Sequence, residues 1–271
     1  MKLGFGFYCH MLDRQHYQFA KQCGATHAVV HLVDYFHCGE SVGDRSQPIG
    51  NLELGWGHAG GTPEEAWSVE SLKSLKAELN DEGLEFEAIE NFDPAHWHDI
   101  LLDGLKRQTQ MEHLKQIIRN VGEAGIPFFG YNFSLAGVSG RHVFHDARGG
   151  AETVGMRGID EVNTTPVPAG MVWNMIYDPE AGPGEQPRID HEMLWQRLTR
   201  FLEELVPVAE EAGVRLAAHP DDPPLDYVRG QPRLVYQPDM YQRLLDIVPS
   251  HHNALEFCLG TLSEMTDGDI Y

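Results

Sequence analysis

Short, almost continuous apolar runs alternate along this chain with longer segments in which apolar residues recur every three or four positions. The short runs are typical of buried β-strands, and near-continuous apolar strands are typical of a parallel sheet covered on both faces. Six such runs predict strands at residues 3–9, 27–32, 86–91, 127–133, 214–219 and 254–259.

Helical periodicity between the runs predicts amphipathic helices over residues 68–83, 111–125 and 190–213. Ser68 and Asp190 are good N-cap residues at the start of two of them, and a glycine closes each of the three. Parallel strands need crossover connections, which are usually helices. The alternation of strands and helices therefore predicts a parallel sheet with helical crossovers.

Two folds fit this alternation, an open doubly wound sheet and a (β/α)8 TIM barrel. No GxGxxG or GxxxxGK[ST] motif follows a strand, so nothing supports a nucleotide-binding open sheet. Polar residues recur instead at the strand ends, which is how barrels build active sites. These residues are Cys9, His10, His31, Glu90, Asn91, Asn132, His219 and Cys258. We therefore predict an α/β fold of the TIM-barrel type.

The number of strands is short of a closed barrel, which would need roughly two more βα units. We therefore expect residues 1–271 to form a single TIM-barrel domain that is C-terminally truncated after about six strands. Residues 33–67 and 134–190 are long and rich in Gly and Pro, unlike short βα loops. Because both follow strands, we expect these loops to lie over the catalytic face.

The amino-acid composition limits the kinds of molecule that this chain is expected to bind and where it is expected to be found. The chain carries 41 acidic residues against 20 basic ones, a formal charge of −21, which disfavours nucleic acid and anionic membrane surfaces. No stretch approaches the roughly 18 apolar residues of a membrane span, and no signal-peptide pattern opens the chain, so we expect a cytoplasmic protein. The 4 cysteines lie far apart without a CxxC motif, which disfavours a disulfide framework. The sequence leaves a homo-oligomer open.

The segment AAHPDDPP, residues 217–224, raises the first question of chemistry. It ends a predicted strand on His219 and then stiffens the chain with three prolines. A strand-terminal histidine at a barrel mouth is well placed to bind a metal, and Asp221 and Asp222 can either orient it as hydrogen-bond acceptors or cap the next turn. The alternative is a histidine satisfied by hydrogen bonds beside a proline-rich turn, and spacing alone does not decide between the two.

Cys258 ends the next strand in the segment EFCLG. As a neighbour of His219 in a barrel it would supply a thiolate, which suits a transition metal and not Mg²⁺. Alone, a cysteine on an apolar strand is more often a small core residue. The two residues together therefore carry more weight than either does separately.

Two further clusters are less specific. The segment HLVDYFHC places His31, Asp34, His37 and Cys38 close together, but without a recognised metal-ligand spacing, so substrate contacts are favoured over a metal site. Residues 93–99, DPAHWHD, are typical of an exposed turn.

Other polar residues fit the binding of a sugar. Glu90 and Asn132 stand at strand ends and can bind sugar hydroxyls, although each can equally hydrogen-bond a strand terminus. Arg141 lies in the second long loop and can neutralise a carboxylate. Arg141, His31 and Tyr8 are the candidates for catalytic residues, and the sequence does not assign the general base.

The segments GVRLAAHPDDPPLDYVRGQPRLV and FCLG resemble the mannonate dehydratase family. The resemblance extends to WSVESLKSLKAELNDEGLEFEAIEN, IRNVGEAGIPFFGYNF and LEELVPVAEEAGVR, in the family's order and over roughly half of the chain. It implies a xylose isomerase-like TIM barrel, a Mn²⁺ or Fe²⁺ cofactor and a place in hexuronate catabolism. The HPDDPP segment with a downstream C-x-G is its most specific part.

By this resemblance His219 and Cys258 match two of the family's metal ligands, while a further His and Asp would come from strands beyond Tyr271. From the sequence itself, Glu90, Asn132, Asp221 and Asp222 are our candidates for contacts with the substrate. The implied reaction is the loss of water from D-mannonate to give 2-dehydro-3-deoxy-D-gluconate, a hydro-lyase reaction on a sugar acid.

The sequence departs from the family pattern in its loops. After YNF the family usually has a Trp-Thr-Arg element, for which Arg141 is the nearest equivalent here. Leu259 follows the cysteine where Thr is usual. These changes touch loops that set specificity more than metal ligands. They leave open a metal-dependent sugar isomerase or epimerase of the same fold, or a catalytically inactive sugar-binding relative.

Overall fold

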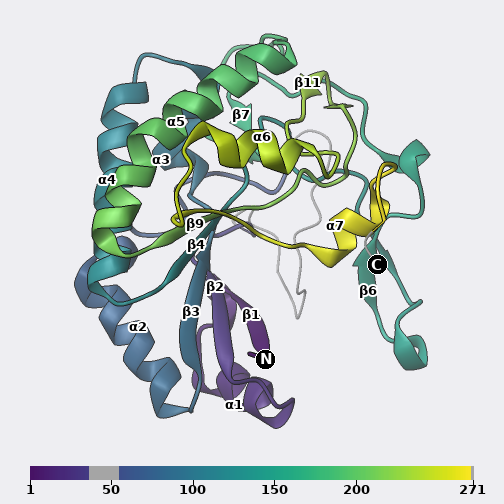
Figure 1. The fold of residues 1–271 in the computed structure, drawn as a ribbon. Helices are drawn as coiled ribbons and strands as arrows, with labels where there is room; N and C mark the ends of the chain where they lie inside the picture. The colour runs from purple at the N-terminus through teal and green to yellow at the C-terminus, as the bar shows by residue number, and fades with distance from the viewer. Residues whose placement is uncertain (37–54, 270–271) are drawn as a thin grey trace.

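The computed structural model describes residues 1–36 and 55–269 (Figure 1). Its main sheet has 6 strands, all parallel to their neighbours, in the order β1-β2-β3-β4-β9-β12. These strands are β1 Gly4–Tyr8, β2 His27–His31, β3 Glu85–Glu90, β4 Phe128–Tyr131, β9 Arg215–Ala218 and β12 Asn253–Leu255. All six predicted strands are confirmed, although β12 ends earlier than expected.

The strand order decides between the two folds. Each strand of the sheet pairs with the next one along the chain, without the reversal of direction that defines a doubly wound sheet. Within the described residues β1 and β12 form the two edges of this sheet. Six consecutive parallel strands in chain order are the arrangement of a TIM barrel, so the predicted α/β fold class is confirmed.

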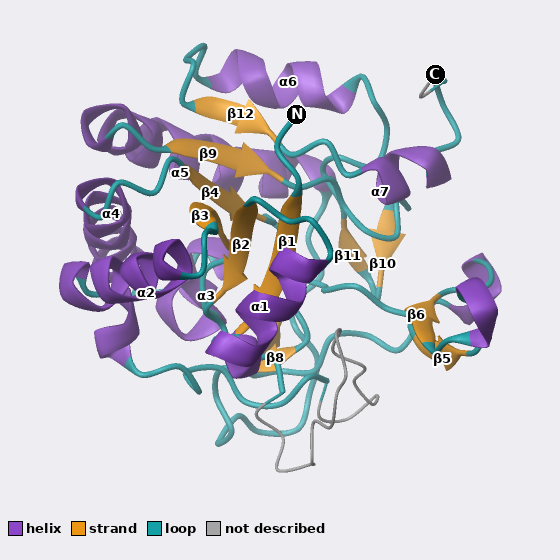
Figure 2. Cartoon of the chain, turned by 90° about the horizontal axis from the view of Figure 1, so that it is seen from below, coloured by secondary structure: helices purple, strands orange, loops and turns teal. Residues whose placement is uncertain are grey.

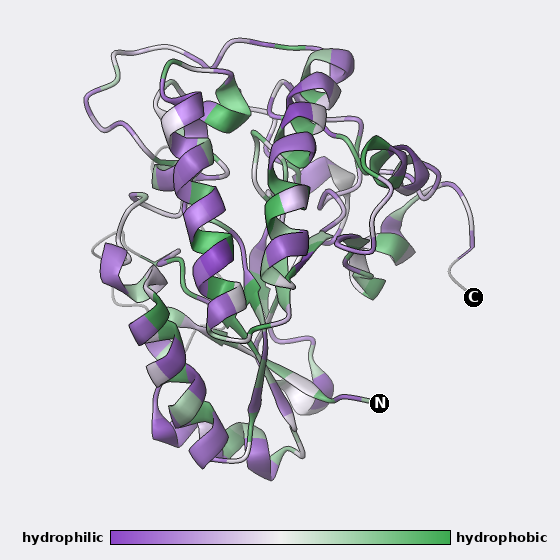
Figure 3. Ribbon diagram, turned by 60° about the vertical axis from the view of Figure 1, so that its left-hand side comes forward, coloured by the Kyte–Doolittle hydropathy of each residue, from purple (hydrophilic) through white to green (hydrophobic). Residues whose placement is uncertain are grey.

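Helices fill the crossovers and lie along the outside of the curved sheet (Figure 2). They are α1 Arg14–Gln22, α2 Val69–Asp81, α3 Pro94–Leu102, α4 Arg107–Glu123, α5 His191–Ala212, α6 Met240–Ile247 and α7 Leu259–Glu264. Four short 3-10 helices are η1 Cys9–Met11, η2 Glu64–Trp67, η3 Arg148–Gly150 and η4 Ile159–Glu161. Polar residues cover the outer faces of the long helices (Figure 3). None of the described helices is long and apolar enough to cross a membrane.

The predicted helix boundaries are confirmed where capping signals were present. Ser71 donates its backbone N–H to Ser68 Oγ at 3.2 Å, and Met193 donates to Asp190 Oδ1 at 2.8 Å. Gly83, Gly125 and Gly213 follow the three helices with φ of 77°, 70° and 70°, a conformation that favours glycine. Helices α1, α3 and α6 were not predicted.

The prediction of an exposed turn at residues 93–99 is wrong, because α3 begins there. Asp93 accepts a hydrogen bond from the Ala95 N–H at 2.8 Å, and Pro94 occupies the first turn, where its missing N–H costs nothing. Trp97 is 2% exposed and packs against Phe201. The apolar face of a short helix, and not a turn, therefore accounts for these residues.

The second predicted long loop carries two small hairpins, and the two long loops meet each other. The second loop contains β5 His142–Phe144 with β6 Thr153–Gly155, and β7 Met171–Val172 with β8 Met175–Ile176. A third hairpin, β10 Tyr227–Val228 with β11 Gln231–Pro232, follows β9. The backbone N–H of Trp56 donates to Asn174 O at 2.7 Å, and the backbone N–H of Ala59 donates to Ile176 O at 2.9 Å. These two hydrogen bonds join the first loop to the second.

Candidate active site

One residue from the end of each main-sheet strand lines a cavity of about 260 Å³. Because the strands are parallel, all their carboxyl ends lie at the same end of the sheet. Side chains that are distant in sequence therefore meet there. The six residues are Tyr8, His31, Glu90, Asn132, His219 and Glu256. Five of them were candidates from sequence; Glu256 was not.

Residues of both long loops complete the cavity. Trp56 comes from the first loop, and Val138, Arg141 and Trp173 come from the second. The indole rings of Trp56 and Trp173 meet edge to face with centroids 4.9 Å apart. These aromatic side chains exclude water from one side of the cavity, which strengthens electrostatic interactions inside it.

His219 follows β9, and its ring is oriented by the backbone. Its Nδ1 lies 2.6 Å from the carbonyl oxygen of Pro220, an atom that can only accept, so Nδ1 carries a proton in this hydrogen bond. Nε2 then faces the cavity, 3.9 Å from Glu256 Oε1. The prediction that Asp221 or Asp222 orients this ring is therefore wrong, because the Pro220 carbonyl does so.

Cys258 lies beside His219, as the sequence proposed. Burial would raise the pKa of its thiol, but hydrogen bonds from His219 and Thr261 outweigh burial and lower that pKa to about 7. Burial likewise would lower the pKa of His219, but the Cys258 hydrogen bond and the charges of Glu256 and Glu90 raise it to about 10. The site therefore stabilises negative charge on sulfur next to positive charge on the imidazole.

Glu90 and Glu256 place two carboxyl groups at the same cavity. The pKa of Glu90 is raised well above its ordinary value, first by burial and then by the charge of Glu256 and a hydrogen bond with it. Gly130 of β4 makes room for Glu90, because a Cβ there would lie 2.1 Å from Glu90 Oε1. Glu256 Oε2 is buried without a hydrogen-bond partner in the described structure.

Asp221 has a different role from the one the sequence suggested. Its side chain accepts hydrogen bonds from the N–H groups of Leu234 and Val235 at 2.8 and 2.9 Å, from Arg233 Nη1 at 3.0 Å, and from Ser134 Oγ. Asp221 and Arg233 are 3% and 1% exposed, and Asp221 is absent from the cavity lining. The prediction of Asp221 as a substrate-binding residue is wrong, because its acceptor capacity is taken up by the loop after β9.

Asp222 and Arg141 both line the cavity. Arg141 Nη2 lies 3.9 Å from Asp222 Oδ2, too long for a strong ion pair, and the guanidinium stands 5.8 Å from the ring centroid of Trp56. The Arg141 guanidinium is therefore a positive group at the cavity that can form an ion pair with an anionic ligand.

Tyr8 and His31 form a stacked pair at the ends of β1 and β2, with ring centroids 4.5 Å apart. Burial, followed by the charges of His219 and Arg141, lowers the pKa of His31 to about 4, and its Nδ1 has no hydrogen-bond partner in the described structure. Burial also raises the pKa of Tyr8, against the opposing effect of Arg141. At neutral pH the pair thus offers a neutral imidazole and a protonated phenol.

Some predicted residues cannot be placed or lie elsewhere. His37 and Cys38 of the segment HLVDYFHC lie outside the described residues. Asp34 accepts a hydrogen bond from the Phe36 N–H at 3.0 Å and is absent from the cavity lining. Asn132 lines the cavity, where its amide can reach a ligand.

The donor set around His219 fits a divalent transition metal. A thiolate and an imidazole nitrogen are both ligands that such ions prefer, and His219 Nε2 is available because Nδ1 is held by a carbonyl. The carboxyl groups of Glu90 and Glu256 stand next to them, and Glu256 Oε2 is buried without a hydrogen-bond partner among the described residues. A metal ion there would give that oxygen a partner and would take the place of the protons that His219 and Cys258 share.

Comparison with known proteins gives a consistent picture. A family model described as D-mannonate dehydratase (UxuA) matches residues 49–175 and 184–271. A mannonate dehydratase of Streptococcus suis is 32% identical over 214 residues, which cover 76% of this chain and 58% of that protein. One from Oceanobacillus iheyensis is 32% identical over 215 residues, 76% of this chain and 60% of the relative.

The fold is also similar to a solved structure. A crystal structure of mannonate dehydratase from Streptococcus suis serotype 2 superposes with a TM-score of 0.68 at 27% identity, and covers 97% of this chain and 64% of that one. The chain thus spans about three fifths of the length of these relatives.

Proposed function

Because this chain belongs to the mannonate dehydratase family, we propose that it carries out the metal-dependent dehydration of D-mannonate to 2-dehydro-3-deoxy-D-gluconate, or a closely related sugar-acid elimination. The observation that carries the proposal is that His219, which follows β9 and lines the cavity, hydrogen-bonds Cys258, which lies after β12 at the start of α7. That cavity, of about 260 Å³, is smaller than typical pockets for drug-sized ligands and suits a small polar substrate.

His219 Nε2 and the Cys258 thiolate are the atoms that would hold the metal, for which Mn²⁺ or Fe²⁺ is the expected ion. When bound, such an ion supplies positive charge that stabilises the negative charge developing on the substrate carboxylate as the C2 proton leaves. Binding requires deprotonated ligands, so it competes with the protons that His219 and Cys258 otherwise share. The Pro220 carbonyl keeps the imidazole in the tautomer that ligation needs.

Arg141 would bind the carboxylate of the substrate. It lies at the cavity in the loop after β4, where the family has an arginine-containing element, and its contact with Asp222 is loose at 3.9 Å. A guanidinium can bind a carboxylate through two parallel hydrogen bonds, which fixes the orientation of C2. Asn132 and Asp222 would bind hydroxyl groups of the sugar chain.

His31 and Tyr8 would transfer the protons. Neutral His31 accepts the proton from C2, the C–H electrons form the C2–C3 double bond, and the C3 hydroxyl leaves as water with a proton from Tyr8. The resulting enol then takes up a proton at C3, loses the proton of its C2 hydroxyl and becomes the 2-keto product. His31 then gives its proton to solvent and Tyr8 takes one up, which restores both groups for the next turnover.

The test is to load the protein with Mn²⁺, add D-mannonate and measure the 2-keto-3-deoxy product with and without chelator. Cys258→Ser should lose the metal equivalent held at this site and product formation, whereas Cys23→Ser, at an exposed cysteine, should lose neither. A rearranged sugar without loss of water would favour the isomerase or epimerase alternative. Binding of D-mannonate without turnover would favour a sugar-binding relative, and metal content unchanged by Cys258→Ser would overturn the assigned ligand.

A further inference from the structure

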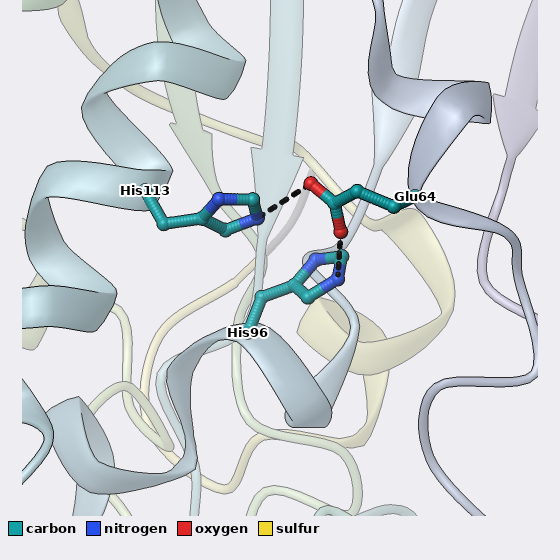
Figure 4. Close-up of side chains that lie close together, drawn as sticks. All are labelled: Glu64, His96 and His113. Carbon is teal, nitrogen blue, oxygen red and sulfur yellow. Dashed lines mark ion pairs between the residues drawn. The ribbon is translucent and has the colours of Figure 1, made fainter.

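A second group of metal-ligating side chains lies outside the sheet, among the helices. Glu64 begins η2, His96 lies in the first turn of α3, and His113 lies on α4 (Figure 4). One ligand atom from each lies within 4.8 Å of the others. None of the three lines the candidate active-site cavity. The group is therefore a separate constellation.

The distances match those between the ligands of one small ion. His96 Nε2 lies 3.2 Å from Glu64 Oε2, and His113 Nε2 lies 3.4 Å from Glu64 Oε1. Tetrahedral coordination with bonds of about 2.0–2.1 Å places neighbouring ligand atoms about 3.3 Å apart. The carboxylate of Glu64 extends between the two imidazoles, as Figure 4 shows. Little movement would be needed to close these atoms around a cation.

Within the part of the chain that the structure describes, hydrogen bonds leave one ring nitrogen of each histidine unsatisfied, although His96 Nε2 lies 3.2 Å from the Glu64 carboxylate. Among the described residues, His113 Nε2 and His96 Nδ1 are both buried and lack a hydrogen-bond partner. An unpaired buried nitrogen is unfavourable by about 1–3 kcal/mol. A metal at His113 Nε2 would satisfy the nitrogen that already points at Glu64.

The surrounding structure holds the ligands in place. The backbone before His96 is fixed by Asp93, which caps α3 and also accepts the Gly60 N–H at 2.9 Å. The indole of Trp67 contacts the His96 ring edge to face at 5.7 Å, and Trp67 O accepts a hydrogen bond from Asn120 Nδ2 of α4 at 2.9 Å. A preorganised set of this kind lowers the entropic cost of binding an ion.

We propose that Glu64, His96 and His113 form a second divalent-metal site of the Zn²⁺ class, with solvent completing the coordination. Two imidazoles and one carboxylate suit Zn²⁺ and similar ions and disfavour Mg²⁺ and Ca²⁺, which prefer oxygen ligands. The ion joins η2 to α3 and α4. The segment that carries Trp56 and Gly60 leads directly into η2, and Trp56 lines the active-site cavity. An ion bound here would therefore fix that segment to α3 and α4. This inference does not depend on the proposed reaction.

A second group, His27, Glu85 and Glu87, is a weaker candidate. Lys2 Nζ lies 2.5 Å from Glu87 Oε1 and already neutralises that carboxylate. The group also holds a single imidazole, His27, and so offers one nitrogen ligand against two in the proposed site. This group serves as a comparison in the experiment.

The test is a calorimetric Zn²⁺ titration of the whole chain, repeated in a Cys258→Ser background that weakens the candidate active site. We expect one Zn²⁺ equivalent to persist in Cys258→Ser and to weaken by at least about tenfold when Glu64→Gln or His113→Gln is added. Glu64 has a 62% exposed side chain, so Glu64→Gln should fold normally. Glu65→Gln, at the next residue, is the matched control and should bind like its parent.

Thermal unfolding supplies a second readout. Zn²⁺ at about 100 times its dissociation constant should raise Tm by roughly 5–10 °C in the Cys258→Ser background, and this shift should vanish with Glu64→Gln but not with Glu65→Gln. Equal stoichiometry and affinity in the Glu64→Gln, His113→Gln and parent proteins would overturn the site. If His27→Gln loses the Zn²⁺ equivalent and Glu64→Gln keeps it, the ion binds at His27, Glu85 and Glu87. That result would also refute the proposal.

Discussion

The buried ion pair between Asp221 and Arg233 offers the sharpest test of how the site is built. Arg233 is 1% exposed, and its guanidinium donates to Asp221 Oδ1 at 3.0 Å, with Gly137 O and Asp222 O as its other acceptors at 3.0 and 3.2 Å. Asp221 is the only one of these acceptors that carries a compensating charge for it. Asp221→Asn keeps the shape of the side chain and removes that charge.

The structure sets the size of the effect. Removing one partner of a buried ion pair costs about 3–5 kcal/mol, because the other charge remains buried. Asparagine keeps one acceptor oxygen for Leu234 or Val235, so we expect the lower end, about 3 kcal/mol in the free energy of unfolding. At roughly 2–4 °C per kcal/mol, Tm should fall by about 6–12 °C.

Urea unfolding followed by circular dichroism measures this change, and Asp222→Asn is the matched control. The Asp222 side chain is 29% exposed and only loosely paired, so its substitution should change stability by less than about 1 kcal/mol. An Asp221→Asn protein as stable as wild type, with a raised KM for D-mannonate, would refute the structural role. It would restore Asp221 as a substrate-binding residue.

Three further predictions follow from close packing and burial. Gly122→Ala should lower unfolding free energy by about 1–3 kcal/mol in urea titrations, because a Cβ at Gly122 would lie 2.3 Å from Ala212 O. Gly130→Ala should lower kcat/KM at least about tenfold with native circular dichroism, since the new methyl would displace the Glu90 carboxyl. The folded pKa of His31, about 4, lies below its ordinary 6.5, so its contribution to stability is present above pH 6.5 and is lost as pH falls toward 4. Between pH 7 and pH 4.5, wild type should therefore lose about 2–3 kcal/mol more unfolding free energy than His31→Gln does.

Each of these has an outcome that contradicts it. A Gly122→Ala protein of wild-type stability would mean that α4 and α5 separate at little cost. Unchanged kinetics in Gly130→Ala would show that Glu90 does not need its present position. A pH-independent difference between wild type and His31→Gln would mean that the imidazole is not held neutral by burial.

The sequence was most informative where function and local pattern coincide. The strand ends at His31, Glu90 and His219 could be located because an apolar run stops at each polar residue. Ser68 and Asp190 marked helix starts because an N-cap acts through hydrogen bonds within its own first turn. Features of this kind depend on neighbours in the chain, and a sequence displays them directly.

The misassigned residues depend on distant partners or on conflicting local signals. Asp221 looked like a site residue because its partner Arg233 is 12 positions away and the pairing exists only in the folded loop. Glu256 was read as part of a strand at 254–259, whereas β12 ends at Leu255 and leaves Glu256 at the cavity. Asp93 and Pro94 did carry a helix-start signal, which the short polar segment after them obscured.

The hydrogen bonds between the two long loops have a consequence for redesign of the substrate range. Gly55 has φ of 56°, and a Cβ there would lie 2.2 Å from Asn174 O, so the two backbones fit only as a matched pair. Exchanging either loop alone for that of a relative would leave Trp56 or Trp173 without its partner. A chimera that is meant to alter substrate specificity must therefore exchange residues 55–60 and 171–176 together.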